Sequence, residues 1–455
     1  MPRKPPTCAG CSFYATSSEW VPDELREGAE VFIVGQNPGV DEAAQGRPFV
    51  GKTGAIMEAR YLKDAGLGRE DVSIGNAIRC RWKNTNDLPP VASKDLKAAL
   101  SHCTQAHFRI PTGTKLIVAQ GDYASVLLTG RTVSDGDSST GWRGYVVPYL
   151  GQPPTVYEQP WVPLPGDLPV LVTVHLARLF REPWLTLPTR RDWSKVPRIL
   201  RHLWPQRPPR FVERPPDEWP AYFTFDTEFY RKDGHEDNDP DTQLIRYSMS
   251  WGPGDGETAV VEWTPEHRAP VPPRDIRPRA VTQYAPADVW HLSRISHTGR
   301  DVWDRFLIED TVWKHATLWS DHSHDLNFLG SIYSRFNRWK HLSDTDPVLY
   351  SGLDAVGLWD VDQALERELN ADPLSRKVWE TIDRPALGEF VRAQYKGLAT
   401  NPARVDEAVR LLKGRAEDAQ ARGRAICGWP INIGSPPQVS KRLYEVEGIK
   451  VPRGA

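Results

Sequence analysis

The sequence predicts an α/β protein with two or three domains. Short apolar runs alternate with stretches of helical character, which is typical of parallel strands joined by helical crossovers. At 455 residues, the chain is longer than one ordinary hydrophobic core requires. Its 39% hydrophobic and 25% charged residues are ordinary for a soluble globular protein.

Four apolar runs in the first part of the chain predict the strands of a parallel sheet. They are residues 31–34, 72–79, 115–119 and 170–174. Helices are expected between them, over residues 54–65 and 94–106. Binding sites in parallel sheets form at the carboxyl ends of the strands. The polar residues and glycines expected at that edge are Gly35, Asn76, Gly121 and His175.

A segment rich in proline and charge, residues 206–220, predicts a linker to a second domain. Three further apolar runs predict a strand meander: residues 222–225, 244–251 and 258–263. From Asp310 onward the chain is expected to be mostly helical. We therefore expect domains over residues 1–205, 221–375 and 376–455.

Charge and hydropathy indicate where the protein works. The net charge of -2 hides an asymmetry, because residues 1–205 carry 24 Lys+Arg against 20 Asp+Glu, about +4, which leaves about -6 for the rest. This weakly favours contact of the first part with DNA. No apolar run approaches the roughly 20 residues that span a bilayer, and no secretory signal follows Met1. A cytoplasmic protein without a membrane partner is expected, in the nucleoid if it binds DNA.

Four of the five cysteines lie in the first quarter of the chain. Cys8 and Cys11 can reach one metal centre from a single turn, and Cys80 and Cys103 would join them from other segments. In a cytosolic protein such a set indicates a metal site before it indicates disulfides. Four thiolates suit either tetrahedral zinc or a [4Fe–4S] cluster.

Several segments of the first 205 residues resemble the motifs of family 4 uracil-DNA glycosylases, in that family's order. They are Gly35–Gly39 with Gly46–Gly51, Asn76–Arg81, Trp142–Gly144 and His175–Leu179. The resemblance implies a three-layer parallel-sheet domain that hydrolyses the glycosidic bond of a uracil flipped out of single- or double-stranded DNA. It also implies that the four clustered cysteines, Cys8, Cys11, Cys80 and Cys103, ligate a structural [4Fe–4S] cluster.

The same resemblance assigns roles to the pocket residues. Phe49 would stack on the flipped uracil, and Asn76 would pair with its O4 acceptor and N3 donor. His175 would donate a hydrogen bond to O2 as negative charge develops on the leaving base. Backbone amides after Gly35 would hold a phosphate or the water.

At the position of the catalytic water the chain departs from family 4. That family usually has glutamate and then alanine, where this chain has Gln36 and Asn37. An amide can orient a water molecule but cannot take its proton, so these two residues are the candidates for positioning the water. Two alternatives stay open: a module that binds uracil-DNA without cleaving it, and a zinc α/β protein unrelated to repair.

A second constellation of acidic residues follows the expected linker. Asp226 and Glu228 are two residues apart in a predicted strand, so their side chains share one face. Such a pair can share a divalent metal in phosphodiester hydrolysis. Tyr350 and Asp354 would lie one helical turn apart, where the tyrosine could orient water and the aspartate could bind metal.

These motifs resemble motifs I and III of the DnaQ-like 3′–5′ exonuclease domain of family A DNA polymerases. Asp310–Thr311 and Asp325–Leu329 resemble the corresponding segments of phage-type members. The resemblance implies an RNase H-like α/β fold and a requirement for Mg²⁺ or Mn²⁺. Motif II is incomplete, because His297–Asp301 is one residue short of the family pattern. Asp301 is the candidate for its carboxylate.

The last part of the chain resembles the start of a family A polymerase thumb. The similarity rests on residues 384–405 and on Asn432–Val439. No polymerase carboxylate motif is found, so the chain alone is not expected to synthesise DNA, and the remaining polymerase region is an expected partner. The whole chain is interpreted as a fusion of glycosylase, exonuclease and helical thumb fragment. In the alternative, the first domain senses uracil without turnover and the exonuclease is the active enzyme.

Overall fold

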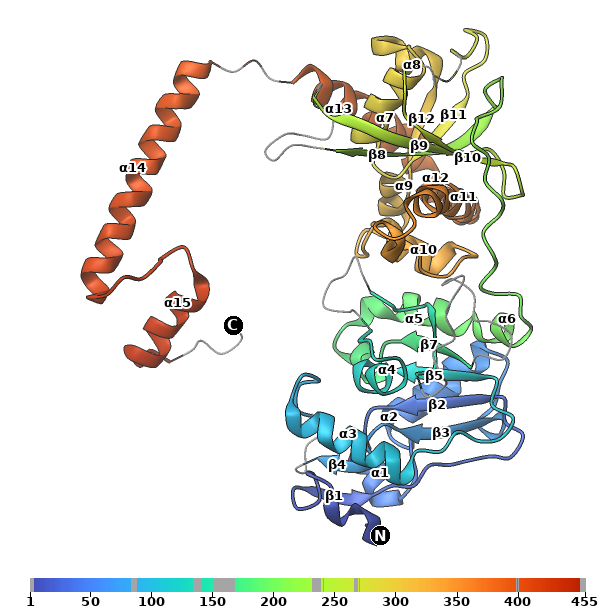
Figure 1. Ribbon diagram of the computed structural model, residues 1–455, viewed down its shortest axis with the longest axis vertical. Coiled ribbons are helices and arrows are strands. Elements are labelled where there is room, and N and C mark those ends of the chain that lie inside the picture. Colours follow the sequence, from blue (N-terminus) through green and yellow to red (C-terminus); the bar gives the residue numbers. More distant parts are fainter. Residues whose placement is uncertain are drawn as a thin grey trace. The chain divides into compact units, whose positions relative to one another are not determined.

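The computed structural model shows a mixed α/β chain, and the strands of its described residues form two five-stranded sheets and one small two-stranded sheet (Figure 1). The structure describes residues 4–82, 88–133, 141–150, 168–230, 239, 241–265, 269, 271–397, 399 and 401–450. The chain divides into two compact units, Met1–Arg392 and Ala393–Ala455. The α/β class predicted from the sequence is therefore confirmed.

The first sheet has the strand order β3-β2-β5-β7-β6. Its members are β2 (Val31–Gly35), β3 (Val72–Asn76), β5 (Leu116–Gln120), β7 (Pro169–Thr173) and β6 (Val146–Pro148). The first four are parallel, and β6 pairs antiparallel with β7 at the edge. The predicted parallel strands are confirmed. Their continuous apolar runs reflect burial on both faces, as in β2, where all five residues are buried.

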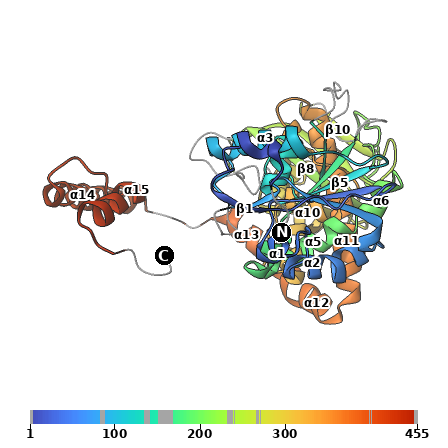
Figure 2. The ribbon, with the colours of Figure 1, turned by 90° about the horizontal axis from the view of Figure 1, so that it is seen from below.

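Helices cover both faces of this sheet. They are α1 (Val40–Gln45), α2 (Lys52–Ile56), α3 (Lys94–His107), α4 (Asp122–Thr129), α5 (Thr186–Trp193) and α6 (Val196–Leu200). Val31 and Ile33 of β2 belong to the apolar cluster that includes α5 and α6, whereas Phe32 and Val34 pack with α4. Figure 2 shows α3 on one side of the strands and α1 and α2 on the other.

A small antiparallel pair, β1 (Ser17–Trp20) and β4 (Cys80–Trp82), lies beside this sheet. It ties the N-terminal segment to the chain that follows β3. Because β4 begins at Cys80, the pair brings the third clustered cysteine toward the segment that carries the first two.

The second sheet has the order β10-β9-β8-β11-β12. Its strands are β8 (Tyr222–Tyr230), β9 (Gln243–Ser250), β10 (Thr258–Glu262), β11 (Arg279–Thr282) and β12 (Leu307–Asp310). The predicted meander is confirmed, since β8, β9 and β10 pair antiparallel. The strands β11 and β12, which the sequence analysis did not predict, run parallel to β8.

Helices lie between β11 and β12 and continue after β12. They are α7 (Ala285–Ile295), α8 (Val302–Arg305), α9 (Thr311–Leu318), α10 (Leu326–Tyr333), α11 (Pro347–Ala371), α12 (Pro373–Val378) and α13 (Arg384–Lys396). The long helix α11 packs against β8 and β9 (Figure 1). Its first turn is capped by Asp346, whose carboxylate accepts from the N–H of Leu349.

The segment predicted to be a linker, residues 206–220, packs against the second sheet instead of hanging free. Val212 forms a parallel bridge with Ala259 of β10. Phe211 packs against the apolar cluster of α10 and α11, and Trp219 is buried. Proline and charge indicated an extended path, but the aromatic side chains bind that path to the core. The two compact units divide between Arg392 and Ala393, which differs from the predicted boundaries after residues 205 and 375.

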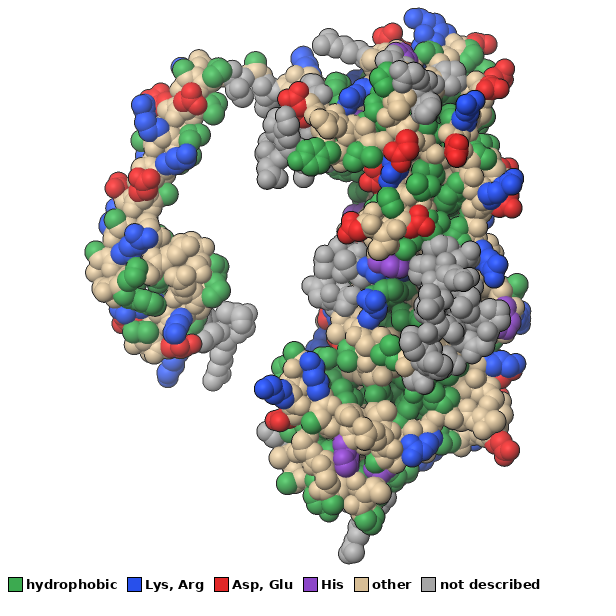
Figure 3. Space-filling model, viewed as in Figure 1, with side chains coloured by type: hydrophobic (Ala, Val, Ile, Leu, Met, Phe, Trp, Pro, Cys, Tyr) green, Lys and Arg blue, Asp and Glu red, His purple; other side chains and the backbone are tan. Residues whose placement is uncertain are grey.

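The second unit holds the helices α14 (Pro402–Cys427) and α15 (Pro436–Ser440). On the face of each unit drawn in Figure 3, basic and acidic side chains of the described residues are interspersed. Within the part of the chain that the structure describes, no helix combines the length and the apolar character that a membrane crossing would need.

Candidate active sites

A cavity of about 640 Å³ opens at the carboxyl ends of the parallel strands of the first sheet. Its lining includes the predicted pocket residues Gln36, Asn37, Phe49, Asn76 and His175. These residues are up to 139 positions apart in the sequence, and the strand order of the sheet brings them together. The structure thus brings these five predicted residues to one cavity, and their roles as a site stay predictions.

Gly35 makes room for the two side chains that meet at the end of β2. It pairs with Asn76 across the sheet. A Cβ atom on Gly35 would lie 2.6 Å from ring atoms of Phe49 and 2.7 Å from the Oδ1 atom of Asn76. No side chain fits at that distance, so glycine at position 35 lets the aromatic ring and the amide approach each other.

Backbone hydrogen bonds join the segment that follows β2 to the segment that follows β3. The N–H of Ala77 donates to the carbonyl of Gly35, and the N–H of Ile78 donates to the carbonyl of Gln36, both at 2.9 Å. The loop after β2 thus continues the pairing of β2 and β3 beyond the end of the strands. This fixes Asn37 relative to Asn76.

Phe49 has a left-handed backbone with φ of 53°, which is uncommon for a residue other than glycine. Two charged side chains hold it there. The guanidinium of Arg69 donates to the carbonyl of Phe49 at 2.8 Å and to that of the preceding residue at 2.6 Å. The carboxylate of Glu42 accepts from the N–H groups of the next two residues at 3.0 and 2.8 Å. The aromatic face of the pocket is therefore preorganised.

The His175 ring presents a neutral N–H to the cavity. Its Nδ1 atom accepts from the backbone N–H of Ala177 at 3.3 Å, which leaves the proton on Nε2. Burial, and then the nearby charge of Arg181, lowers the pKa of His175 to about 4. The ring lies 6.1 Å from that of Phe49, centroid to centroid.

We expect this low pKa to be visible in the pH dependence of the protein. Because the pKa of His175 falls from 6.5 to about 4 on folding, the unfolded chain takes up the proton first as the pH drops. The stability that neutral His175 contributes is thus present above about pH 6.5 and is lost toward pH 4. A rate profile of base excision should show no step near pH 6.5. A step there that disappears in His175→Gln would contradict this assignment.

The Asn37 amide is oriented by its own neighbour. Its Nδ2 atom donates to the carbonyl of Pro38 at 3.2 Å, so the Oδ1 atom remains as an acceptor. Three carboxylates that the sequence analysis did not select also line the cavity, those of Asp41, Glu42 and Asp122. Glu42 accepts from the backbone as described, and Asp122 accepts from the N–H of Val133 at 2.7 Å. This leaves Asp41, which is exposed, as a carboxylate that a bound water could reach.

The four predicted cluster ligands face one small cavity. All four are free thiols: Cys8, Cys11, Cys80 and Cys103. Burial raises the pKa of Cys80 to about 11, and burial followed by the proximity of Cys103 and Cys11 raises that of Cys8. Four sulfur donors around one cavity are a ligand set that suits a cationic metal centre, so these residues fit a metal cluster.

Arg79 and His107 also line the cysteine cavity, and the sequence analysis did not select either of them. The Arg79 guanidinium donates to the Sγ atom of Cys103 at 3.7 Å and forms a buried ion pair with Asp23 at 2.5 Å. His107 contacts the Sγ atom of Cys8 through Nε2 at 3.1 Å. Both positions are next to or four residues from a cysteine, but nothing in the spacing alone marks them.

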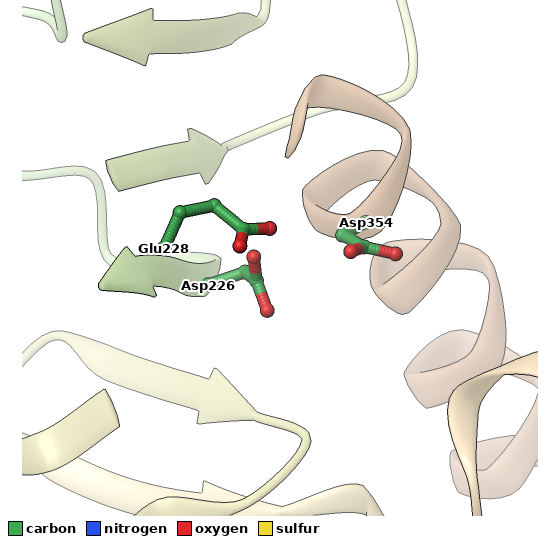
Figure 4. Close-up of side chains that lie close together, drawn as sticks. All are labelled: Asp226, Glu228 and Asp354. Atoms are coloured by element: carbon green, nitrogen blue, oxygen red, sulfur yellow. The ribbon is translucent and has the colours of Figure 1, made fainter. Parts of the chain in front are cut away.

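A second site lies between the second sheet and α11. Asp226 and Glu228 project from the same face of β8, and Asp354 projects toward them from α11 (Figure 4). One oxygen atom of each carboxylate lies within 4.8 Å of the others. The predicted geometry of these three residues, two on one strand face and one on a helix, is what the structure shows.

The carboxylates of this site repel one another. Burial, then the charge of Asp354, raises the pKa of Glu228 to about 7. Burial and the charges of Asp354, Asp288 and Glu228 raise that of Asp226, whose Oδ2 atom has no hydrogen-bond partner within the described part of the chain. A buried carboxylate oxygen without a donor, beside two other carboxylates, fits a divalent cation.

The prediction of Asp301 as the motif II carboxylate is corrected by the structure. Asp301 is exposed at the end of a 3-10 turn, and among the described residues the group of close carboxylates comprises Asp226, Glu228 and Asp354, without Asp301. The additional buried carboxylate is Asp288 of α7, which raises the pKa of Asp226 and accepts from the hydroxyl of Thr227 at 2.7 Å. The spacing rule failed because Asp288 lies before the segment that resembles the motif. Asp288 lies in the first turn of α7, which follows β11, and the sequence analysis predicted neither element.

Tyr350 and Asp354 lie one turn apart on α11, as predicted, and Lys340 joins them. The Nζ atom of Lys340 donates to Asp354 Oδ1 at 2.6 Å and to the hydroxyl of Tyr350 at 3.1 Å. The proximity of Asp354, Tyr350 and Asp226 raises the pKa of Lys340 above its usual range. No sequence motif marks this lysine.

Another acidic group comprises Glu309 of β12 with Asp362 and Glu366 of α11. Here cations already occupy the centre. Lys314, which is fully buried, lies 2.5–2.7 Å from all three carboxylates, and Arg279 contacts the same three. These residues form a structural ion-pair network, unlike the group around Asp226.

At the edge of the parallel sheet, the first cavity is lined by an aromatic ring (Phe49), an amide (Asn76) and an imidazole (His175). Residues 22–196 match the Uracil DNA glycosylase superfamily. A type-4 uracil-DNA glycosylase of Thermotoga maritima is 32% identical over 145 residues, which are 32% of this chain and 70% of that relative. The chain belongs to the uracil-DNA glycosylase superfamily.

Other similarities cover smaller parts. The type-4 uracil-DNA glycosylase of Archaeoglobus fulgidus is 40% identical over 84 residues, 18% of this chain, and the match spans 42% of that relative. Among solved structures, the POL domain of Pol1 from M. smegmatis covers 52% of this chain and 39% of its own, with 17% identity and a TM-score of 0.35. The match to Brucella melitensis NrnC with bound Mg²⁺ covers 40% of this chain and 87% of that protein, with 15% identity and a TM-score of 0.29. These scores are too low to establish a shared fold.

Proposed function

We propose that the first region excises uracil from DNA by hydrolysing the N-glycosidic bond of a flipped nucleotide. The observation that carries this proposal is the single cavity that collects Phe49, Asn76, His175 and Asn37. A base inside a duplex is inaccessible, so an enclosed pocket for one base requires flipping.

Each side chain has a step in the proposed reaction. Phe49 stacks on the base, and the amide of Asn76 donates to O4 and accepts from N3–H. Cytosine reverses that pattern, so it would leave buried polar groups unpaired. The neutral Nε2–H of His175 donates to O2 as charge builds on the leaving base. The Asn37 Oδ1 atom orients the water that attacks the sugar.

Release of free uracil from a labelled single-stranded or double-stranded DNA tests this function. The competing proposal, a uracil-DNA binding module without turnover, is motivated by the amides at Gln36 and Asn37. Tight binding of uracil-DNA without released base would favour it.

We also propose that the four clustered cysteines hold a [4Fe–4S] cluster. The four sulfur atoms around one cavity, with Arg79 donating to one of them, support an anionic thiolate cluster. When bound, the cluster orders the segments that carry its ligands. By joining the N-terminal segment, β4 and α3, the cysteines fix the part of the chain next to β3.

Replacing Cys80 by serine is expected to remove the cluster, because serine is a poor ligand for iron and three thiolates leave one iron without its protein ligand. Purified protein should lose most of its iron and its broad absorbance. Cys427→Ser is the matched control, because Cys427 belongs to the second unit. Retention of iron in the Cys80 variant, or stoichiometric zinc in the wild type, would contradict the assignment.

We further propose a 3′–5′ exonuclease activity for the second region. The supporting observation is the carboxylate group Asp226, Glu228 and Asp354, with Asp288 beside it. These residues would hold Mg²⁺ or Mn²⁺, which activates water and stabilises the phosphodiester transition state. Tyr350 would orient the attacking water. Degradation of a 3′-labelled strand that EDTA abolishes tests this proposal.

For the rest of the chain we propose a role beside a polymerase. The segments from residue 384 onward resemble a family A thumb, so the remaining polymerase region and DNA are the proposed partners, in the cytoplasm of a bacterial cell or a phage-infected one. Joining a uracil-excising domain to a polymerase would raise the local concentration of one at the product of the other. Equal processivity on uracil templates for fused and separated forms would contradict this role.

A further inference from the structure

A five-residue segment, Asn337–His341, lies between the edge of the first sheet and the acidic site around Asp226, Glu228 and Asp354. We call it the strap. It follows α10 and precedes α11, and its residues divide between two sets of partners. Some contact the glycosylase region, and the others contact the acidic site.

Three strap residues face the glycosylase region. Asn337 pairs with Val146 of the edge strand β6 in both directions: its Oδ1 accepts from the backbone N–H at 3.1 Å and its Nδ2 donates to the carbonyl at 2.9 Å. Arg338 lies over the ring of Trp142 at 4.5 Å, and the ring of His341 lies 5.6 Å from the same indole. The side chain of Asn337 thus completes the edge of the first sheet.

Trp339 and Lys340, the two remaining strap residues, face the acidic site. The indole Nε1–H of Trp339 donates to Asp354 Oδ1 at 2.7 Å. Lys340 donates to the same oxygen and to the hydroxyl of Tyr350. Trp339 is fully buried against Gly330 of α10 and Gly357 of α11, where a Cβ atom would lie 2.7 and 2.8 Å from its ring.

The junction around the strap is held firmly. Tyr145 donates its hydroxyl to the carbonyl of Asn327 at 2.8 Å. Trp204 donates to the carbonyl of Ser334 at 3.2 Å. Lys195, which is buried, donates to the carbonyl of Ser331 at 2.5 Å. A strap anchored on both sides cannot shift on one side without moving the other.

We propose that Lys340 is a positioning residue of the exonuclease site and that the glycosylase region, through Trp142 and the strap, holds it in place. This inference rests on the proposed exonuclease function. The ammonium of Lys340 holds the side chains of Asp354 and Tyr350 together on α11, and its positive charge offsets the repulsion among the carboxylates. The acidic site is therefore completed by a region of the chain that carries a different activity.

The first test separates positioning from metal binding. In Lys340→Met the loss of a positive charge should leave Mn²⁺ affinity equal or raise it by about tenfold. The same variant should lower exonuclease kcat by about 10²-fold, because Tyr350 and Asp354 lose their common donor. Lys340→Arg should restore most of kcat. Parallel losses of Mn²⁺ affinity, kcat and folding, without rescue by arginine, would overturn the positioning role.

The second test addresses the glycosylase side of the strap. Trp142→Ala should raise hydrogen exchange in the peptide that contains Tyr350 and Asp354 and should lower exonuclease kcat, whereas Trp142→Phe should do neither. Arg191→Ala is the matched control: it removes an ion pair across the same junction, to Glu368 at 2.8 Å, but it does not touch the strap.

The outcomes distinguish the two proposals. A wild-type chain that binds no Mn²⁺ and degrades no DNA would refute the exonuclease function, while exchange in Trp142→Ala would still report whether the strap transmits the contact. A wild-type chain that binds Mn²⁺ and degrades DNA, together with unchanged exchange and kcat in Trp142→Ala, would refute the strap and leave the exonuclease in place.

Discussion

Replacing Asn76 by aspartate is expected to lower uracil excision by roughly 10³-fold or more, because a site built to pair with a polar edge rejects a mismatched partner strongly. The amide of Asn76 can donate to O4 and accept from N3–H, whereas a carboxylate can only accept. The oxygen that replaces the nitrogen would face O4, acceptor against acceptor. Single-turnover excision from an oligonucleotide with one uracil measures the loss.

Asn370→Asp supplies the matched control for that change. Asn370 is exposed, and its Oδ1 atom already accepts from Arg376 at 2.8 Å, so a carboxylate keeps the interaction. This variant should excise uracil as the wild type does. If Asn76→Asp retained more than a tenth of the wild-type rate with an unchanged preference for uracil over cytosine, Asn76 would not read the base.

Replacing Asp226 by asparagine is expected to reduce exonuclease activity by about 10³-fold, since one charged metal ligand contributes several kcal/mol of transition-state stabilisation. Asp226 is half-buried in the acidic group, and its buried Oδ2 atom lacks a protein donor within the described residues. Uracil excision should be unchanged, because the glycosylase cavity contains no residue of β8. Degradation of a 3′-labelled strand and uracil excision, measured on one preparation, give both values.

Glu366→Gln tests whether any buried acidic residue would have the same effect. Contacts with Lys314, Arg376 and Arg279 lower the pKa of Glu366 to about 2 despite its burial, which identifies it as an ion-pair partner. The variant should lower the melting temperature and keep exonuclease activity. Equal losses of activity in both variants would mean that the Asp226 group supports the fold and not the reaction.

The strands and the first cavity were predictable because their signals are local or follow from topology. Continuous apolar runs such as Val31–Val34 indicate strands buried on both faces. Parallel strands place their carboxyl ends at one edge, so Asn76 and His175 could be brought together without knowing any contact. The pair Asp226 and Glu228 was predictable for the same reason, since the period of a strand fixes a shared face.

The remaining features depend on contacts between distant segments. Lys340 precedes α11 by seven residues, and only the path of the strap brings its ammonium to Asp354. Asp288 was missed because the sequence of His297–Asp301 resembles motif II, so the carboxylate was expected at Asp301. The segment 206–220 has the composition of a linker, yet Phe211 and Trp219 pack it against the core. Amino-acid composition indicates the local backbone preference, but it does not predict the tertiary contacts that a side chain makes.

The most direct test of the central claim uses the whole chain, purified without oxygen, and a 5′-labelled oligonucleotide that contains one uracil. The reaction contains EDTA, which silences metal-dependent nuclease activity, and is followed by hot alkali, which breaks the strand at an abasic site. We expect one cut, at the uracil, that is lost in Asn76→Asp. An uncut strand from protein with its cluster intact would contradict it, and the first region would then bind uracil-DNA without hydrolysing it.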